Sequence, residues 1–272
     1  ACGNVVRNVT ATELAGVEPG EPFDVTPWGM ALARFLLNHP DGQSLGRKFK
    51  VTLSGTFEPE FNYGALHDIG ATALVQDGVE GFHVVVGGGL GAVPHEARVL
   101  AEFVPAAELL PLTAAVLRVF AEHGEKKNRA RARLKFVVAK FGIERFRELV
   151  AIERNKLSDD QLGTDQIRDF ELWTDSPLFP PGQAFPETED PVLRQWLRTN
   201  TRPQKQDGYS AIKVKVPTGD LTPSQLRGLA QLLRDHVGDT LRIGVDQSLF
   251  IRWVSWDRLL KVKEELEALG LG

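Results

Sequence analysis

The sequence predicts a mixed α/β fold of the α+β kind, and three observations lead to it. Segments with the two-residue alternation of strands and segments with helical spacing are interspersed in both halves of the chain. Of the 272 residues, 42% are hydrophobic and 25% are charged, as is typical of globular proteins. The apolar runs end well before the roughly 18–20 residues that a membrane-spanning helix needs. With a net charge of −4 and no leader pattern, we expect a cytoplasmic protein with neither a nucleic-acid nor a membrane partner.

Turn residues and caps mark the elements of the first half. Residues 1–25 are expected to form an extended segment followed by a loop rich in Gly and Pro. Thr26 before Pro27 predicts a helix start at which the Thr side chain is the N-cap. The alternation over 48–54 predicts a strand. The same patterns predict further strands at 69–75 and 81–86, and helices at 109–123, 128–141 and 143–154.

The chain divides into two units by composition. Residues 156–191 are acidic and rich in proline, which predicts a linker between a unit at 1–155 and a second unit at 192–272. In the second unit, Thr222 with Gln225 three residues later is a helix-start signature, and Gly270 is a natural helix stop. We expect strands there at 209–216, 241–245 and 249–254, and helices at 223–233 and 256–269.

The chain has one cysteine, Cys2, and six histidines that show no metal-ligand spacing. One thiol excludes an internal disulfide, an all-cysteine zinc site and an iron–sulfur cluster held by this chain alone. We therefore expect Cys2 to be a buried small residue. We also expect no metal ligand among the side chains of this chain.

A glycine-rich loop at 87–91 follows a predicted strand. Glycines allow positive φ angles and a close approach of a ligand to the backbone. A dinucleotide-binding loop would open a helix and be followed about 20 residues later by an acidic side chain, and neither pattern is present. A tight structural turn is the simpler interpretation, and a nicotinamide site remains an alternative.

Basic residues cluster on the predicted strand at 48–54. Lys48 and Lys50 point to the same side of this strand because alternate residues share a face, and Arg47 adds a third cation. Like charges placed side by side repel unless water or an anion lies between them. The lysines therefore either protect an exposed strand edge or face an anionic ligand.

A second basic segment, residues 126–135, has six cations in ten positions. On the helix predicted here, Lys127, Arg131 and Lys135 would share one face, and Arg129 and Arg133 another. The segment is either a solvated helix face or a site for a polyanion. Because the whole chain is acidic, a local anionic ligand is favoured over DNA.

Several segments, in order along nearly the whole chain, resemble the sirohaem-dependent nitrite and sulfite reductases. No single motif decides the resemblance, but the set is specific. In the first half the matching segments are Cys-Gly-Asn-Val-Val-Arg-Asn-Val-Thr at 2–10, Gly-Arg-Lys-Phe-Lys at 46–50, His-Asp-Ile-Gly at 67–70, Val-Gly-Gly-Gly-Leu-Gly at 86–91 and Glu-Phe-Val-Pro at 102–105. They continue with Asn-Arg-Ala-Arg-Ala-Arg-Leu-Lys-Phe at 128–136, Gly-Asp-Leu-Thr at 219–222, and Leu-Arg-Ile with Asp-Gln over 241–247.

The resemblance implies both an architecture and an activity. Residues 1–155 would be a sirohaem-fold domain with a mixed sheet and packed helices, lacking its N-terminal part. Residues 192–272 would be a small ferredoxin-like half-domain. The activity would be a six-electron reduction of sulfite to sulfide, or of nitrite to ammonia, at a sirohaem coupled to a [4Fe–4S] cluster. The partners would be the small anion and an electron donor such as ferredoxin.

The resemblance also assigns residues to the site. Arg7, Lys48 and Lys50 would be catalytic, holding anionic oxygens and helping to supply protons. Nitrite reductases of the family often have Asn at the position of Lys50, which favours sulfite. The residues expected to contact the cofactor are Arg7, Asn8, Lys48, Lys50, His67, Gly87, Gly88, Gly89, Asn128, Arg129, Arg131 and Arg133, with Lys135 on the same basic segment.

The chain departs from the family pattern at the cluster. The family holds its [4Fe–4S] cluster with four cysteines in a C-x5-C and C-x3-C arrangement that follows the second small domain, and Cys2 is not one of them. We therefore expect an internal piece of a larger reductase, inactive by itself, with the cluster ligands outside this chain. Two alternatives stay open: an NAD(P)-dependent oxidoreductase that uses the 87–91 loop, and a non-catalytic polyanion-binding module.

Overall fold

The computed structural model describes residues 3–37, 39–43, 45–60, 62–158, 167, 169–170 and 175–272. Two compact units make up the chain: Ala1–Gly16 with Glu21–Trp173, and Val17–Gly20 with Thr174–Gly272. The short Val17–Gly20 segment belongs to the second unit, where the Lys205 N–H donates to the Val17 carbonyl at 2.9 Å. The composition of the sequence does not predict that this segment belongs to the second unit. Among the described helices, none is long and apolar enough to cross a membrane.

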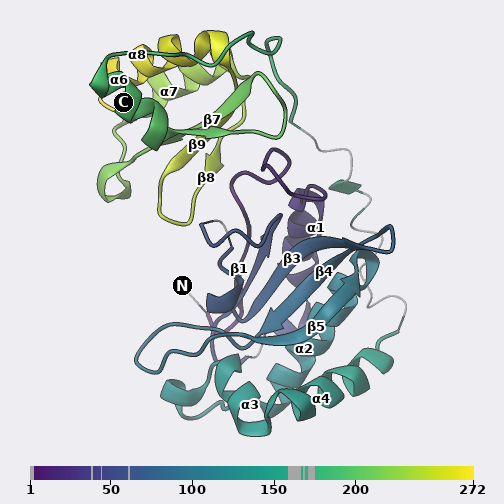
Figure 1. The fold of residues 1–272 in the computed structure, drawn as a ribbon. Coiled ribbons are helices and arrows are strands. Elements are labelled where there is room, and N and C mark those ends of the chain that lie inside the picture. The colour runs from purple at the N-terminus through teal and green to yellow at the C-terminus, as the bar shows by residue number, and fades with distance from the viewer. Residues whose placement is uncertain are drawn as a thin grey trace. The chain divides into compact units, whose positions relative to one another are not determined.

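The first unit is built on a five-stranded mixed sheet with the order β1-β2-β3-β4-β5 (Figure 1). β1 (Val6–Ala11), β2 (Phe49–Ser54) and β3 (Ile69–Gln76) are parallel, and β4 (Val79–Val86) and β5 (Arg98–Pro105) continue the sheet antiparallel. The mixed sheet expected from the sequence is confirmed. The sequence patterns did not predict β5, because its buried and exposed residues do not alternate regularly. β1, β2 and β3 start at the same edge of the sheet. β4 ends at that edge, because it runs antiparallel to β3.

The helices of the first unit pack with its sheet around one hydrophobic core. They are α1 (Thr26–Leu37), α2 (Leu109–His123), α3 (Leu134–Phe141) and α4 (Ile143–Asn155). The buried rings of Phe49 on β2 and Phe120 on α2 stack with their centroids 6.0 Å apart, so α2 packs against the sheet. Figure 1 shows α2, α3 and α4 gathered on one side of the sheet.

The start of α1 is correctly predicted, but its cap is not. Asp24 Oδ1 accepts from the Thr26 N–H at 2.8 Å, whereas the buried Thr26 hydroxyl has no hydrogen-bond partner among the described residues. The reason is that the first turn begins one residue early, with the Gly29 N–H donating to the Val25 carbonyl. Thr26 therefore lies inside the helix, and Asp24 is the residue positioned to cap it.

The basic segment predicted as one helix over 128–141 is a turn followed by a shorter helix. Arg129–Arg131 forms a 3-10 turn that Asn128 caps by accepting from the Ala130 N–H at 3.1 Å. Arg133 is extended (φ −82°, ψ 154°), and α3 begins only at Leu134. The shared faces predicted for residues 127–135 are therefore wrong. Cations at helical spacing repel one another, and Arg133 instead turns toward a carboxylate described below.

The second unit has a four-stranded antiparallel sheet with the order β6-β7-β9-β8. The strands are β6 (Thr201–Pro203), β7 (Tyr209–Val214), β8 (Arg242–Ile243) and β9 (Leu249–Ser255). Figure 1 shows the helices of this unit as a layer over its sheet. Ile212 of β7 and Ile251 of β9 are buried in the core between the two layers.

The helices of the second unit are α6 (Pro191–Asn200), α7 (Pro223–His236) and α8 (Leu259–Ala268). The predicted capping of α7 is confirmed, since Thr222 and Gln225 form a reciprocal capping box. The predicted stop at Gly270 is confirmed as well, with a φ of 70°. The sequence patterns did not predict α6, which begins at the end of the proline-rich 156–191 segment. Part of that segment lies outside the described residues, as does Cys2.

Candidate functional site

The candidate site is the edge of the first sheet at which β1, β2 and β3 start. In the register of the sheet, Asn8 of β1 lies beside Lys50 of β2, and Val51 of β2 lies beside Ile69 of β3. Arg7 falls at a bulge in the pairing of β1 with β2, and it is exposed. Parallel pairing thus gathers cations that are more than 40 positions apart in the sequence.

A buried carboxylate, Asp68, lies at the centre of this edge. Its side chain is fully buried, and its Oδ2 accepts from the Lys50 main-chain N–H at 3.0 Å. Arg133 donates to Asp68 through two nitrogens, with Nε 3.2 Å and Nη2 2.9 Å from Oδ1 and Nη2 also 2.9 Å from Oδ2. Burial raises the pKa of Asp68 to about 6, although Arg133 and the Lys50 N–H both act to lower it. The pair is thus a charge-assisted contact in a dry environment.

Lys48 lies among cations. Burial lowers the pKa of its ammonium below the ordinary value, and the positive charges around it lower the pKa further. These charges belong to Lys50, Arg133, Arg7 and Arg47. Asp68 supplies one negative charge to this cluster, and the positive charges outnumber it, so the arrangement favours an anionic ligand.

His67 completes the edge as a neutral side chain. Its Nδ1 is 2.8 Å from the Tyr63 carbonyl, and because a carbonyl only accepts, Nδ1 is assigned the proton. Burial lowers the pKa of His67, and the charges of Lys50 and Arg133 lower it further. The second ring nitrogen, Nε2, is therefore an acceptor near pH 7.

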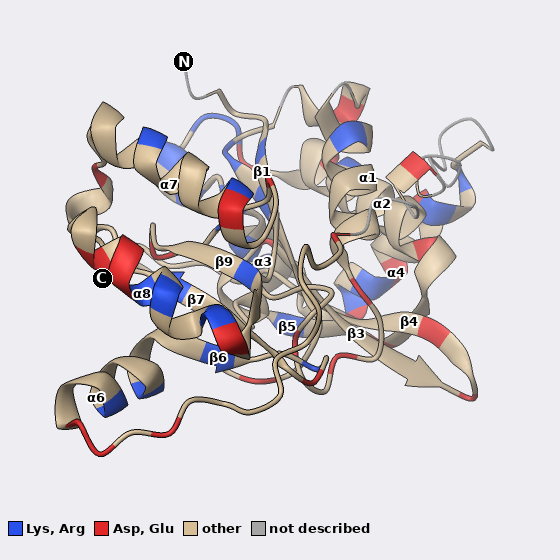
Figure 2. Ribbon diagram, turned by 90° about the horizontal axis from the view of Figure 1, so that it is seen from above, with Lys and Arg blue, Asp and Glu red and all other residues tan. Residues whose placement is uncertain are grey.

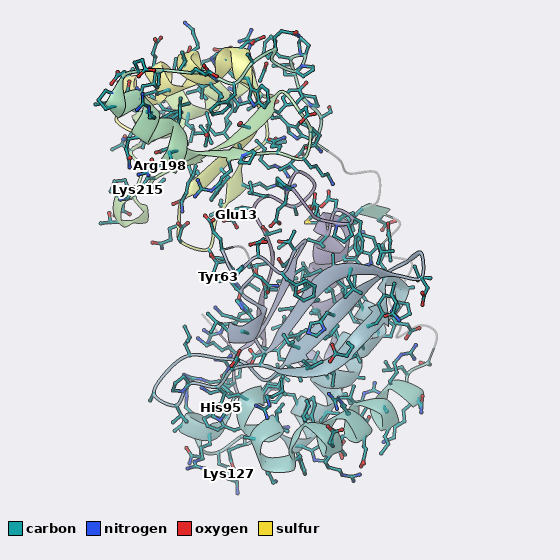
Figure 3. The ribbon with its side chains drawn as sticks, viewed as in Figure 1. Glu13, Tyr63, His95, Lys127, Arg198 and Lys215 are labelled. Carbon is teal, nitrogen blue, oxygen red and sulfur yellow. The ribbon has the colours of Figure 1, made fainter. Side chains whose placement is uncertain are left out.

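The glycine loop after β4 packs directly on the segment that leads into β3. The Gly87 N–H donates to the Asp68 carbonyl at 3.0 Å, and the Gly88 N–H donates to the His67 carbonyl at 2.9 Å. A Cβ on Gly88 would lie 2.3 Å from the Ala65 carbonyl oxygen, so only glycine fits there. Figure 3 labels Tyr63 and His95, which come from the segments before β3 and after the glycine loop. These glycines have a structural reason, independent of any ligand.

The loop joins two antiparallel strands and does not open a helix. A dinucleotide site needs the loop to lead from a strand into a helix whose N-terminus meets the phosphates. The fold therefore gives no support to the nicotinamide alternative.

Lys135 is a buried cation with a different task. Its side chain is only 4% exposed, and its ammonium donates to the carbonyls of Gly89 at 3.3 Å, Leu90 at 3.2 Å and Val93. Three N–H groups thus meet three carbonyl oxygens, which satisfies the ammonium. Lys135 therefore holds the loop beyond the glycines, and its role is structural.

The remaining predicted contact residues lie on the turn before α3. Arg129 and Arg131 are exposed there, and the Asn128 side chain is used as the turn's cap. The structure thus brings together Arg7, Lys48, Lys50, His67 and Arg133, while Arg129 and Arg131 stand on the exposed turn. Sequence reasoning missed Asp68 as the centre of the site. The sequence signal for Asp68 is an acidic residue next to the strand predicted at 69–75. That signal does not identify a site unless the pairing of the strands is known.

The helix surfaces elsewhere carry acidic and basic side chains mixed together, unlike the cation cluster. Figure 2 shows acidic and basic residues interspersed on α4, α7 and α8. Arg145 pairs with Glu148 on α4, and Lys263 pairs with Glu267 on α8. Exposed pairs of this sort contribute little to stability. The sheet edge differs, because cations surround Lys48 there.

Fold and site together define a two-unit α/β protein with a cation cluster at the edge of a mixed sheet. Residues 2–157 match the nitrite and sulphite reductase 4Fe-4S domain, and residues 202–269 match the nitrite/sulfite reductase ferredoxin-like half domain. The chain belongs to the nitrite and sulfite reductase family. The resemblance seen in the sequence motifs, including the ferredoxin-like half-domain, is thereby confirmed.

Named relatives cover both substrates of this family. The chain is 29% identical to the chloroplastic ferredoxin–nitrite reductase of Arabidopsis thaliana over 90% of its length and 39% of the relative's. It is 35% identical to the sulfite reductase [ferredoxin] of Mycobacterium tuberculosis over 100% of its length and 44% of the relative's. The NirA structure of Mycobacterium tuberculosis superposes with a TM-score of 0.75 at 28% identity, covering 100% of this chain and 45% of that one. The chain thus spans less than half the length of these relatives.

Proposed function

We propose that this chain forms part of a sirohaem- and [4Fe–4S]-dependent reductase that converts sulfite to sulfide or nitrite to ammonia with six electrons. The observation that carries the proposal is the convergence of Arg7, Lys48 and Lys50 at one sheet edge. The family of the chain and the names of its relatives support it. A ferredoxin-type protein is the proposed electron donor, as in the names of those relatives.

The cation cluster suits a macrocycle with many carboxylates and a small anion beside it. When bound, sirohaem supplies the iron at which the anion is reduced. Lys48 and Lys50 offer ammonium protons, and the lowered pKa of Lys48 makes its ammonium a better proton donor near neutral pH than an ordinary lysine. Arg7 presents a planar guanidinium, which suits it to hold an anionic oxygen. Binding and proton delivery are thereby divided between Arg7 of β1 and the lysines at the start of β2.

The residues of this chain do not fit the iron–sulfur cluster. The chain has a single cysteine, and the described residues contain no group of three His, Cys, Asp or Glu side chains able to hold a metal. A [4Fe–4S] cluster takes four thiolates. We therefore place its ligands outside these 272 residues.

Macrocycle binding tests the proposal without electrons or a cluster. Uroporphyrin III, an iron-free octacarboxylate macrocycle, is titrated into the chain and followed by its fluorescence. We expect salt-sensitive binding that weakens at least tenfold in the Lys48→Met/Lys50→Met variant. The matched control is Lys126→Met/Lys127→Met, which removes the same charge from an exposed segment and should bind as wild type. Equal weakening in both variants, or no binding by the wild type, would contradict the proposal.

Lys50 is the position that tests substrate choice. In the complete reductase, Lys50→Asn removes one proton-bearing cation and should lower sulfite turnover more than nitrite turnover. The assay compares kcat/KM for the two anions with a reduced dye as the electron source. Equal losses for both anions would remove the argument for sulfite.

A further inference from the structure

The cation cluster is organised around one residue whose side chain no ligand could reach. The Asp68 carboxylate has no exposed surface, yet it contacts Arg133 and the main chain of Lys50. We propose that Asp68 is the positioning residue of the cluster: it fixes Arg133 and the start of β2, and so sets how Lys48 and Lys50 are presented to an anion. The inference deepens the proposed function and rests on it for the identity of that anion.

Asp68 joins three separate segments of the first unit. Its Oδ2 accepts from the Lys50 N–H and so continues the strand pairing of β2 through a side chain. Its Oδ1 binds Arg133, the residue immediately before α3. Its main-chain carbonyl accepts from Gly87, at the start of the glycine loop. A single residue therefore ties β2, α3 and the loop to the beginning of β3.

Asp68 also provides a negative charge within the cluster. The charged groups that act on it are Arg133, Lys48 and Lys135, with Lys50 bound through its N–H, and His67 precedes it in the chain. The pKa of about 6 means that the carboxylate is ionised at neutral pH and takes up a proton in mild acid. Protonation weakens the contact with Arg133, because the charge-assisted character of the hydrogen bonds is lost.

Nuclear magnetic resonance on the full chain tests this role. The signals to follow between pH 4.5 and 8 are the Lys50 amide N–H and the Arg133 Nε–H. The Lys48 side-chain carbons are followed from pH 7 to pH 11. In the wild type we expect the Lys50 and Arg133 signals to share one midpoint near pH 6. In Asp68→Asn, which keeps an acceptor for Lys50 but no charge, that midpoint disappears. The Lys48 ammonium also titrates at lower pH in this variant, because an attractive charge is gone.

The matched control is Glu102→Gln. It makes the same carboxylate-to-amide change at an exposed residue of β5 that pairs with His83. We expect this variant to leave the Lys50, Arg133 and Lys48 signals as in the wild type.

Three outcomes would overturn the inference. One is separate midpoints for Lys50 and Arg133 in the wild type, or none between pH 5 and 7. Another is a midpoint that survives in Asp68→Asn, since it would then belong to His67. The third is an unchanged Lys48 titration in that variant. If Asp68→Asn does not fold, the wild-type titration alone decides.

The result is independent of the proposed reaction. None of these signals needs a macrocycle, a substrate or electrons. A chain that binds no uroporphyrin III but shows the shared midpoint would refute the proposed function and retain the role of Asp68. Tight macrocycle binding without the shared midpoint would do the reverse.

Discussion

Replacing Asp68 by Asn should change how the stability of the first unit depends on pH. Folding raises the pKa of Asp68 from an ordinary value of 3.8 to about 6, mainly because the carboxylate is buried. A carboxyl group with a raised pKa binds its proton more tightly in the folded state. Its contribution to stability is therefore fully present below pH 3.8 and is lost as the pH rises through about 6.

The size of the effect follows from the two pKa values. The gap between 3.8 and about 6 corresponds to about 3 kcal/mol over the whole pH range. Between pH 5 and pH 7 the wild type should lose about 1 kcal/mol through Asp68. Solvent screening does not reduce this effect much, because the side chain has no exposed surface. Asn does not titrate, so the variant lacks this part of the pH dependence.

Urea unfolding at pH 5 and pH 7 measures the difference. Because two units can unfold separately, the first unit is followed alone by hydrogen exchange of peptides from β2 and β3. On acidification from pH 7 to pH 5, the wild type should gain about 1 kcal/mol more than Asp68→Asn. Glu102→Gln should behave as the wild type. An equal gain in wild type and Asp68→Asn, or a larger gain in the variant, would refute the reasoning.

Three further predictions concern packing and capping. Lys135→Met leaves three loop carbonyls without their donor, so the first unit should lose about 1–3 kcal/mol in urea unfolding and the loop amides should exchange faster. Gly88→Ala places a Cβ 2.3 Å from the Ala65 carbonyl oxygen and should cost about 1–3 kcal/mol, read as a lower unfolding midpoint; an unchanged midpoint would mean that the two segments separate easily. Thr222→Ala removes the capping box with Gln225 and should cost the second unit about 1 kcal/mol, whereas Thr222→Ser should cost little.

Local signals in the sequence predicted most of the secondary structure. The alternation over 48–54 and the helical spacing over 109–123 correspond to β2 and α2, since each depends on residues close together in the chain. The capping of α7 follows for the same reason. The helix predicted over 128–141 is wrong in its first part. Arg133 is extended there because it binds Asp68, a residue far away in the sequence.

The site could be predicted only in part. Lys48 and Lys50 stand out because the predicted strand over 48–54 places them on one face, although β2 itself begins at Phe49 and Lys48 directly precedes it. The convergence of Arg7 with them depends on parallel pairing of β1 and β2, which the sequence alone does not specify. The sequence correctly located the glycine loop. The reason for its glycines is the close approach of the 65–67 backbone, which only the tertiary structure shows.

The sequence by itself determined the class of this protein, its mixed α/β composition, its single thiol and the strand that carries Lys50 and directly follows Lys48. These properties depend on residue types and short spacings, which remain the same in any fold. Only the tertiary structure decided that Arg133 and Lys135 are held inside the protein while Lys48 lies among cations. The physical reason is that a buried carboxylate and three loop carbonyls bind those two cations, and these partners are 42 to 65 positions away in the sequence.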